Sequence, residues 1–509
     1  MPEQNCFVEF LLEPKNYPFP VDGIEHFETH ISHVFLAGDF AFKLKKAIQL
    51  PFLDFRRVED RKFYLEEELR LNRRYAEPLY LEVRSLSLHG GEVSWGEGGG
   101  VLEYLLKMRR FKTADLFSSL LKSGELTREH LIELTCKVAR FHKEASLEPE
   151  FFSGEAVRAL VFDCFEAIDE EYRPKKEFED RVSVVLKQLS PMMQSRQKTH
   201  VRHLHGDLHL KNICLFKGEA YPFDGIEFDK RYSCIDTFAD IAFLLMDLWY
   251  EGRGDYAWVV LNTYLEQSFD YEGVALLRLF LTYRFLVRAK VAYLRYSQLR
   301  KESDLQSARN HLTFSQSVMS ESSPLLFIVG GFSGSGKTYL SKILAEQKGL
   351  IHLRTDVFRK HLAGVALGEK LPEEKYSKEF TKAVYESVYA EARRLLSLGF
   401  GVVIDGVHGS DRTQRLAHSL VAQFPRAAYL LWCEAPKNTV AERLQQRSGD
   451  ASDADLSIYE KQVMSGWEVS SSSWTKIATN VSRGALELIL DELADPHQLR
   501  TARCSSSGR

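Results

Sequence analysis

The sequence predicts two consecutive domains: an α+β domain of two lobes, then an α/β domain whose parallel sheet is flanked by helices. Three observations support this prediction. Short predicted strands lie within residues 1–108 and helices dominate residues 111–300, so a strand-rich lobe precedes a helical one. From residue 325 onward, apolar strands alternate with helices at the spacing of βαβ units. Each half also carries its own phosphate-handling motif.

Length and composition limit the class of protein. A chain of 509 residues is too long for one hydrophobic core, and its 44% hydrophobic and 27% charged residues are typical of soluble globular proteins. The net charge of −4 gives no support for bulk binding to nucleic acid or anionic membranes. Seven scattered cysteines, no signal peptide and no long apolar run lead us to expect a cytoplasmic protein without disulfides or a membrane span. The oligomeric state does not follow from the sequence.

The first lobe contains a strand and a helix that suit nucleotide binding. Residues 40–45 alternate, so Lys43 and Lys45 share one face of a strand, and an acidic-to-basic helix follows at about 56–76. Kinases pair a strand lysine with a glutamate of the next helix so that the lysine meets the nucleotide phosphates. We choose Lys43, with Lys45 as the alternative. The partner is Glu68 or Glu67, which the sequence does not separate, and we take Glu68.

The segment HGDLHLKN at 205–212 has the residues and spacing of a kinase catalytic loop. Phosphoryl transfer needs a hydroxyl steered in line and metal ions that neutralise phosphate oxygens. Asp207 is expected to accept the proton of the acceptor hydroxyl, and Asn212 to bind a metal ion. A short strand pair then returns the chain to Asp224, a candidate ligand for the metal that bridges the phosphates.

The pattern HGDxHxxN with a later aspartate resembles the aminoglycoside phosphotransferase and choline kinase group, whereas protein kinases carry HRDxxxxN and DFG. Residues 235–242 are similar to a downstream stretch of that group whose second aspartate supports the catalytic loop. Residues 1–300 therefore resemble an aminoglycoside phosphotransferase-like kinase with a bilobal, protein-kinase-like fold. The resemblance implies ATP, Mg²⁺ and a small-molecule hydroxyl as acceptor.

The second half begins after a polar stretch. We interpret residues 301–323 as a linker with room for one helix, residues 324–500 as the second domain and residues 501–509 as a disordered tail. The segment GFSGSGKT fits the P-loop pattern between a strand and a helix. Its backbone is expected to close around phosphates, with the lysine on the β/γ-phosphates and the threonine on Mg²⁺. The binding residues are Gly331, Ser333, Gly334, Ser335, Gly336, Lys337 and Thr338.

Charged residues after the P-loop complete a second candidate site. Asp356 follows the second strand and is expected to take a proton from an acceptor hydroxyl, with Arg359 one turn later to hold an acidic acceptor. Asp405 ends the third strand, at the position that holds magnesium in Walker B motifs. Arg443 and Arg447 are four residues apart, as in a lid whose arginines contact the transferring phosphate.

Residues 325–450 resemble the small P-loop kinases of the gluconate kinase, zeta-toxin and polynucleotide kinase group. The order of the two halves resembles proteins described as bifunctional aminoglycoside phosphotransferase and ATP-binding protein. Our leading hypothesis is a two-site, ATP-dependent phosphotransferase that acts on hydroxyl groups of small molecules. One alternative is a pseudokinase sensor that regulates a P-loop ATPase or kinase. The other is a kinase for the 5′-hydroxyl end of nucleic acid, which the charge balance does not favour.

Overall fold

The computed structural model describes residues 4–50, 53–96, 98–320, 323–424, 427–446, 451–470 and 472–493. The chain forms two compact units. Unit 1 contains residues 1–252 and 276–319, and unit 2 contains residues 253–275 and 320–509. The predicted disordered tail lies outside the described residues. Unit 2 thus includes a segment that the sequence analysis assigned to the first domain.

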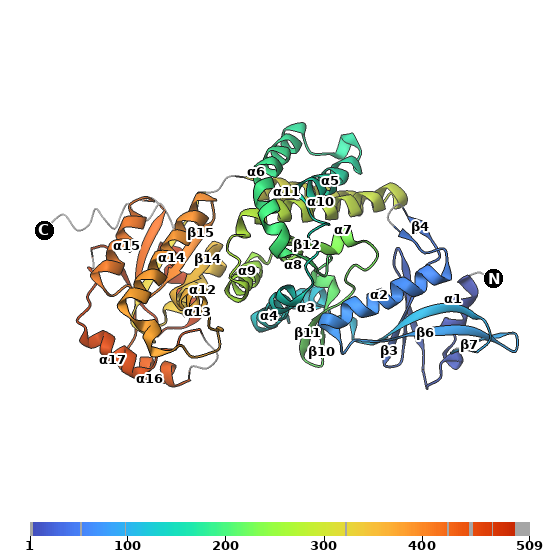
Figure 1. Ribbon diagram of the computed structural model, residues 1–509, viewed down its shortest axis with the longest axis horizontal. Helices are drawn as coiled ribbons and strands as arrows, with labels where there is room; N and C mark the ends of the chain where they lie inside the picture. Colours follow the sequence, from blue (N-terminus) through green and yellow to red (C-terminus); the bar gives the residue numbers. More distant parts are fainter. Residues whose placement is uncertain are drawn as a thin grey trace. The chain divides into compact units, whose positions relative to one another are not determined.

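The first lobe of unit 1 is built on a six-stranded antiparallel sheet with the order β1-β2-β3-β8-β6-β7 (Figure 1). In β3, Phe42 and Leu44 enter the hydrophobic core, so Lys43 and Lys45, which alternate with them, face the other side, as predicted. The helix that follows, α2 (Val58–Ala76), packs on β6 and β8. The strands are β1 (Ile24–Glu28), β2 (Ser32–Ala37), β3 (Phe40–Lys45), β6 (Tyr80–His89), β7 (Glu92–Trp95) and β8 (Val101–Arg109).

The rest of unit 1 is mainly helical, with short strand pairs that carry the catalytic-loop segment. The pair β9 (Val201–His203) and β12 (Cys234–Asp236) brackets this segment, and β10 (Ile213–Phe216) and β11 (Glu219–Pro222) follow it as a hairpin. The remaining short elements at the N-terminus and beside the sheet are α1 (Gln4–Leu12), β4 (Gln49–Leu50) and β5 (Leu53–Asp54). The helices are α3 (Phe117–Ser123), α4 (Arg128–Glu144), α5 (Gly154–Glu166), α6 (Lys176–His200), α7 (Lys230–Ser233), α8 (Thr237–Tyr250), α10 (Val274–Leu299) and α11 (Glu302–Val318).

The stretch interpreted as a linker is mostly helix. Helix α11 buries Leu305, Ala308 and Leu312, and His311 stacks on Tyr250 with ring centroids 4.0 Å apart. The polar composition of this stretch concealed one apolar face, which α11 packs within unit 1.

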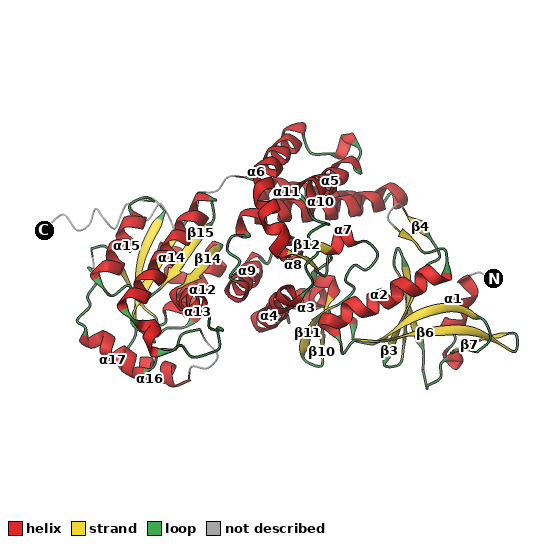
Figure 2. Cartoon of the chain, in the orientation of Figure 1, coloured by secondary structure: helices red, strands yellow, loops and turns green. Residues whose placement is uncertain are grey.

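Unit 2 has a parallel sheet with the order β14-β15-β13-β16-β17, flanked by helices (Figure 2). Phe327 and Val329 of β13 join a core with α12 and α18, while α14 packs on β14 and β15. The strands are β13 (Leu326–Gly331), β14 (Leu350–Arg354), β15 (Gly401–Asp405), β16 (Ala428–Glu434) and β17 (Thr475–Ala478). The helices are α9 (Gly254–Ser268), α12 (Lys337–Lys348), α13 (Thr355–Ala363), α14 (Lys378–Ser397), α15 (Asp411–Val421), α16 (Lys437–Gln446), α17 (Leu456–Met464) and α18 (Arg483–Leu493). The predicted fold class is confirmed for both halves.

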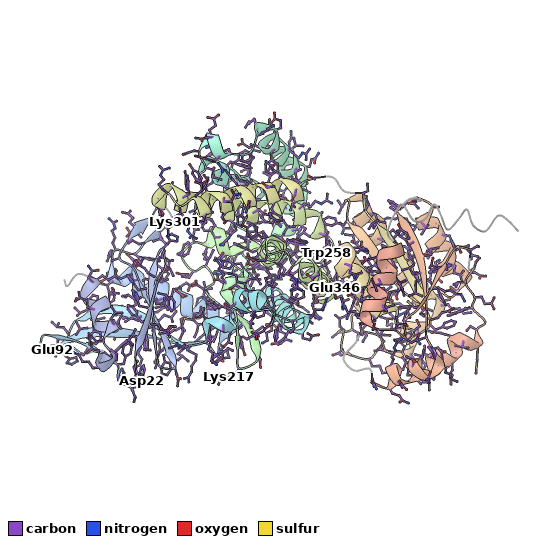
Figure 3. All side chains as sticks on the ribbon, turned by 180° about the vertical axis from the view of Figure 1, so that it is seen from behind. Asp22, Glu92, Lys217, Trp258, Lys301 and Glu346 are labelled. Carbon is purple, nitrogen blue, oxygen red and sulfur yellow. The ribbon has the colours of Figure 1, made fainter. Side chains whose placement is uncertain are left out.

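Helix α9 covers the edge strand β14. The Asn262 side chain acts as a strand partner: its Nδ2 donates to Leu350 O at 3.0 Å, and its Oδ1 accepts from the His352 N–H at 2.8 Å. Trp258, one turn earlier and labelled in Figure 3, lies against Gly349. A Cβ added at Gly349 would come within 2.9 Å of the indole Nε1. The edge strand is therefore capped by side chains of α9, which satisfies backbone groups that would otherwise be open to another strand.

Among the described residues, no helix combines the length and the apolar character that a membrane crossing requires.

Replacing Asn262 by Ala is expected to lower the free energy of unfolding of unit 2 by about 1–3 kcal/mol, because two partly buried backbone groups lose their partners. Calorimetry is expected to show a lower unfolding temperature, and hydrogen exchange is expected to speed up in residues 350–354. The matched control is Asn310→Ala in α11, whose side chain accepts a hydrogen bond from the amide of Gln306. Equal behaviour of the two variants would contradict the capping role.

Candidate functional site

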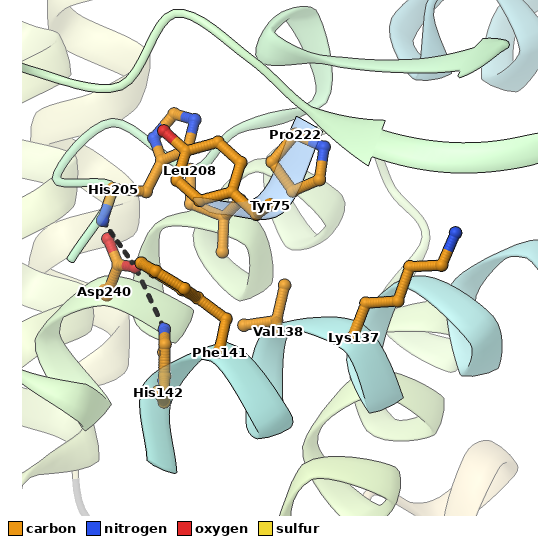
Figure 4. A pocket seen from close by; sticks show the side chains of 9 residues that line it. All are labelled: Tyr75, Lys137, Val138, Phe141, His142, His205, Leu208, Pro222 and Asp240. Atoms are coloured by element: carbon orange, nitrogen blue, oxygen red, sulfur yellow. Dashed lines mark hydrogen bonds and ion pairs between the residues drawn. The ribbon is translucent and has the colours of Figure 1, made fainter. Parts of the chain in front are cut away.

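The catalytic-loop segment of unit 1 is held from behind by Asp240 of α8. Its Oδ1 accepts from the Gly206 N–H at 2.8 Å, and its Oδ2 lies 3.1 Å from His142 Nε2 and 3.4 Å from the His205 N–H (Figure 4). Burial raises the pKa of Asp240, but the contact with His142 outweighs it and the pKa is lowered. Gly206 has φ +81°, and an added Cβ would lie 2.6 Å from Tyr232 O. Only glycine fits at position 206 of this loop.

Asp207 and Asn212 lie together, as the motif predicts. Asn212 Nδ2 donates to the carboxylate Oδ2 of Asp207 at 3.0 Å and to its backbone oxygen at 3.1 Å. His209 Nε2 is 3.4 Å from the same Oδ2. Burial raises the pKa of Asp207, but the nearby His209 outweighs it, so the pKa lies below the ordinary value. The carboxylate is therefore oriented and ionised at neutral pH.

Asp224 is brought to the same region by the hairpin. The Phe223 N–H donates to Asn212 O at 2.8 Å, which fixes the residue before Asp224 beside the catalytic loop. Asp224 has φ +61°, and its N–H donates to Tyr80 Oη at 2.9 Å. The Lys43 ammonium forms an ion pair with the Asp224 carboxylate. Strand, helical lobe and hairpin thus converge on one point.

Both candidate lysines contact Glu68. Lys43 Nζ lies 2.7 Å from Glu68 Oε1, and Lys45 Nζ lies 2.9 Å from Glu68 Oε2. Burial raises the pKa of Glu68, but the two ammonium groups outweigh it and lower the pKa to about 2. Glu67 instead pairs with Arg70 on the surface of α2. The geometry thus favours Glu68 over Glu67 as the partner of the strand lysine.

The two lysines differ in their second partner. Lys43 reaches Asp224, whose side chain is 47% exposed, whereas Lys45 pairs with the buried Glu227. Burial raises the pKa of Glu227, and the negative charge of the nearby Glu68 adds to this effect. Together they outweigh the opposite effect of Lys45. Lys43 therefore faces the region open to a nucleotide, and Lys45 neutralises the interior. The pairing of Glu227 with Lys45, which is far away in sequence, has no local signal in the sequence.

The P-loop in unit 2 has the predicted backbone. Gly331, Gly334 and Gly336 have φ of +140°, +77° and +89°, conformations that favour glycine. Lys337 Nζ donates to Phe332 O at 2.9 Å, so the lysine lies across the loop. Thr338 Oγ1 donates to Asp405 Oδ2 at 2.6 Å. The hydroxyl and the carboxylate expected to bind magnesium are thus adjacent.

These donor sets suit Mg²⁺. Thr338 and Asp405 offer hard oxygen atoms, and Asn212 and Asp224 offer the same chemistry in unit 1. Within the described ranges, no group of three or more His, Cys, Asp or Glu side chains could hold a metal by itself. Magnesium in phosphoryl-transfer sites takes one or two protein ligands and completes its shell with phosphates and water. Both sites fit that pattern.

The two carboxylates of the second site have opposite electrostatics. Burial raises the pKa of Asp356, at the start of α13. Burial also raises the pKa of Asp405, but the neighbouring His352, whose Nε2 lies 3.6 Å from Asp405 Oδ2, outweighs it and the pKa is lowered. One carboxylate is therefore held ionised and the other is the better proton acceptor.

The arginines expected to contact substrate have protein partners. Arg359 Nη1 donates to Lys375 O at 2.9 Å and to Thr381 Oγ1 at 3.1 Å, so at this atom the guanidinium supports the chain rather than facing an open pocket. Arg443 Nη1 approaches the P-loop at Gly334 O, 3.4 Å away, and its Nη2 donates to Thr479 O at 2.7 Å. Arg447 lies outside the described residues.

Sequence reasoning missed Gln462 of α17. Its Oε1 accepts from the Ser333 N–H at 2.8 Å, and its Nε2 donates to Ser333 Oγ at 3.1 Å. A single glutamine on a surface helix carries no sequence signal, so only the packing of α17 on the P-loop reveals it.

The chain is similar to several known proteins. Residues 326–465 match the family model described as an AAA domain. The chain is 31% identical over 445 residues to the uncharacterized protein Rv2004c of Mycobacterium tuberculosis, covering 85% of this chain and 88% of that protein. It is 30% identical over 144 residues to shikimate kinase of Synechococcus elongatus, covering 26% of this chain and 75% of that enzyme. Among solved structures, a choline/ethanolamine kinase family protein from Mesorhizobium loti is similar at 13% identity and a TM-score of 0.41, covering 62% of this chain and 94% of that one.

Replacing Lys45 by Met is expected to destabilise unit 1 by about 3–5 kcal/mol, because the buried Glu227 would lose its lysine partner and Glu68 would keep only Lys43. Lys43→Met is expected to cost less stability and to weaken ATP binding instead. Denaturant unfolding and ATP titration of both variants measure the two effects. A larger loss of stability in Lys43→Met than in Lys45→Met would contradict this division of roles.

Proposed function

We propose an ATP-dependent phosphotransferase with two sites as the function of this chain, which belongs to the same protein family as the Mycobacterium tuberculosis protein Rv2004c. This proposal is supported by the presence of the same three kinds of functional group in both units. Each unit gathers a lysine suited to phosphate, an oxygen pair suited to Mg²⁺ and a second carboxylate suited to an acceptor hydroxyl. The acceptors proposed are hydroxyl groups of small molecules.

In the first site, Lys43 would bind the ATP phosphates once Asp224 turns to the metal. Asp207 would orient the acceptor hydroxyl for in-line attack on the γ-phosphorus and accept its proton, while the bond from that phosphorus to the β–γ bridging oxygen breaks. Mg²⁺, when bound, supplies charge that neutralises the phosphate oxygens. Asn212 would hold Asp207 in place through its amide and offer its carbonyl oxygen to the metal.

In the second site, the P-loop backbone and Lys337 would cradle the phosphates. Thr338 and Asp405 would hold the metal, and Asp356 would accept the proton of the second acceptor. Arg443, beside Gly334 and Thr479, would fix the P-loop and approach the transferring phosphate. Gln462 accepts a hydrogen bond from the Ser333 N–H, a backbone group that faces bound phosphate in P-loops. We assign Gln462 to the same lid as Arg443.

The assembled groups in unit 1 favour an active kinase over a pseudokinase sensor. A sensor would need no ionised Asp207 held by Asn212, and no lysine shared between Glu68 and Asp224. Arg359, which we expected to hold an acidic acceptor, gives the nucleic-acid alternative no support, because its Nη1 already has two partners in the protein.

Asp207→Asn and Asp356→Asn, each made in the full chain, are expected to silence different reactions. Loss of a positioned base typically costs about 10²–10⁴-fold in rate. Screening against hydroxylated metabolites with ATP and Mg²⁺, and following ADP release, is expected to divide the active acceptors into two sets. Each set loses turnover in one variant, while ATP binding stays nearly unchanged.

The control is Asp180→Asn, which removes an exposed carboxylate of α6. Turnover of every acceptor at the wild-type rate in Asp207→Asn would refute the first site, and the same result in Asp356→Asn would refute the second.

A further inference from the structure

We infer that Glu266 of α9 is a positioning residue for the proposed metal site of unit 2. This inference rests on the function proposed above. The residue is far from any motif, and it stands in the part of the sequence that resembles the aminoglycoside phosphotransferase group. It nevertheless belongs to unit 2, with the rest of α9. The inference follows from the face of α9, the contacts of its carboxylate and the groups beyond them.

Three side chains on one face of α9 follow the edge strand from its start to its end. Trp258, Asn262 and Glu266 are four residues apart, so they lie on one stripe of the helix. Trp258 meets Gly349, Asn262 meets the backbone of Leu350 and His352, and Glu266 reaches the last residue, Arg354. The first two contacts dock the helix. The third brings a carboxylate to the carboxyl end of β14, where the P-loop site lies.

The Glu266 carboxylate contacts two buried basic side chains. Its Oε2 accepts from Arg354 Nη1 at 3.2 Å, and its Oε1 lies 4.0 Å from His352 Nδ1. The side chains of Arg354 and His352 are 4% and 1% exposed, and that of Glu266 is 17% exposed. A buried guanidinium needs a nearby counter-charge, which Glu266 provides from outside the sheet.

Beyond these two residues lie the carboxylates of the site. The other ring nitrogen of His352 is 3.6 Å from Asp405 Oδ2, the oxygen that also accepts from Thr338. Arg354 and Asp405 are register partners on neighbouring strands, and Arg354 also acts electrostatically on Asp356. Glu266 therefore draws Arg354 toward α9 and fixes the imidazole ring between two carboxylates. Without it, the guanidinium would turn to Asp405 and Asp356 and compete with Mg²⁺ for their oxygens.

The test measures how ATP binding by the second site depends on Mg²⁺. The full chain carries Lys43→Met and Asp224→Ala to weaken nucleotide binding by the first site. Calorimetric titration with ATP over a series of Mg²⁺ concentrations gives the concentration for half-maximal binding. Glu266→Gln is expected to raise this concentration by about tenfold, as loss of one favourable charge interaction does. ATP binding in EDTA is expected to stay unchanged, and Glu266→Asp is expected to recover part of the loss.

Two controls separate this role from simple packing. Asn262→Ala loosens the docking of α9 but keeps the carboxylate, and Glu272→Gln removes an exposed charge just after α9. Both are expected to keep the Mg²⁺ dependence of the parent. An equal shift in Asn262→Ala and Glu266→Gln, or no shift in Glu266→Gln, would overturn the inference. If Lys337→Ala on the same background leaves Mg²⁺-dependent ATP binding intact, the proposed second site fails, and the inference fails with it.

Discussion

The chemistry proposed for both units depends on keeping carboxylates ionised where water is scarce. Burial by itself favours the neutral acid, so an ionised carboxylate inside the protein needs a cation or several donors close by. In unit 1, Asp240 contacts His142 and two backbone N–H groups, and Glu68 forms ion pairs with two lysines. In unit 2, His352 serves Asp405. The buried basic side chains also need polar partners, and some of these partners lie far from the motifs in the sequence.

That requirement explains why the sequence division and the structural units differ. Helix α9 is continuous in sequence with helices of unit 1, yet Asn262 satisfies the edge strand of the other sheet and Glu266 balances Arg354. A fragment that began at residue 324 would lose both contacts. Its edge strand would have open backbone groups, and Arg354 would lose the carboxylate of Glu266. The P-loop unit is therefore complete only with residues 253–275.

The sequence predicted the parts of each site that local spacing controls. Asp207 and Asn212 are five residues apart on one loop, and alternation alone put Lys43 and Lys45 on one face of β3. The P-loop glycines and the adjacent Thr338 also follow from a short motif. The choice between Glu67 and Glu68 depended on how α2 is rotated against the sheet, which a charged helix with three consecutive glutamates does not reveal. Contacts such as those of Glu266 and Gln462 join segments far apart in sequence, so no local sequence pattern predicts them.

The two proposed bases differ in a way that bears on how each would work. His209 keeps the pKa of Asp207 low, so this carboxylate is a weak base, held firmly by Asn212. Burial keeps the pKa of Asp356 high, so it accepts a proton more readily. In a loose, dissociative transition state the hydroxyl proton leaves late, and orientation of the nucleophile contributes more than basicity. A rigid, weakly basic Asp207 suits that demand. The nearby Asp405, which is ionised, disfavours a second negative charge on Asp356. The second site therefore separates its two carboxylates into a metal ligand and a proton acceptor by electrostatics, whereas the first site separates them by geometry.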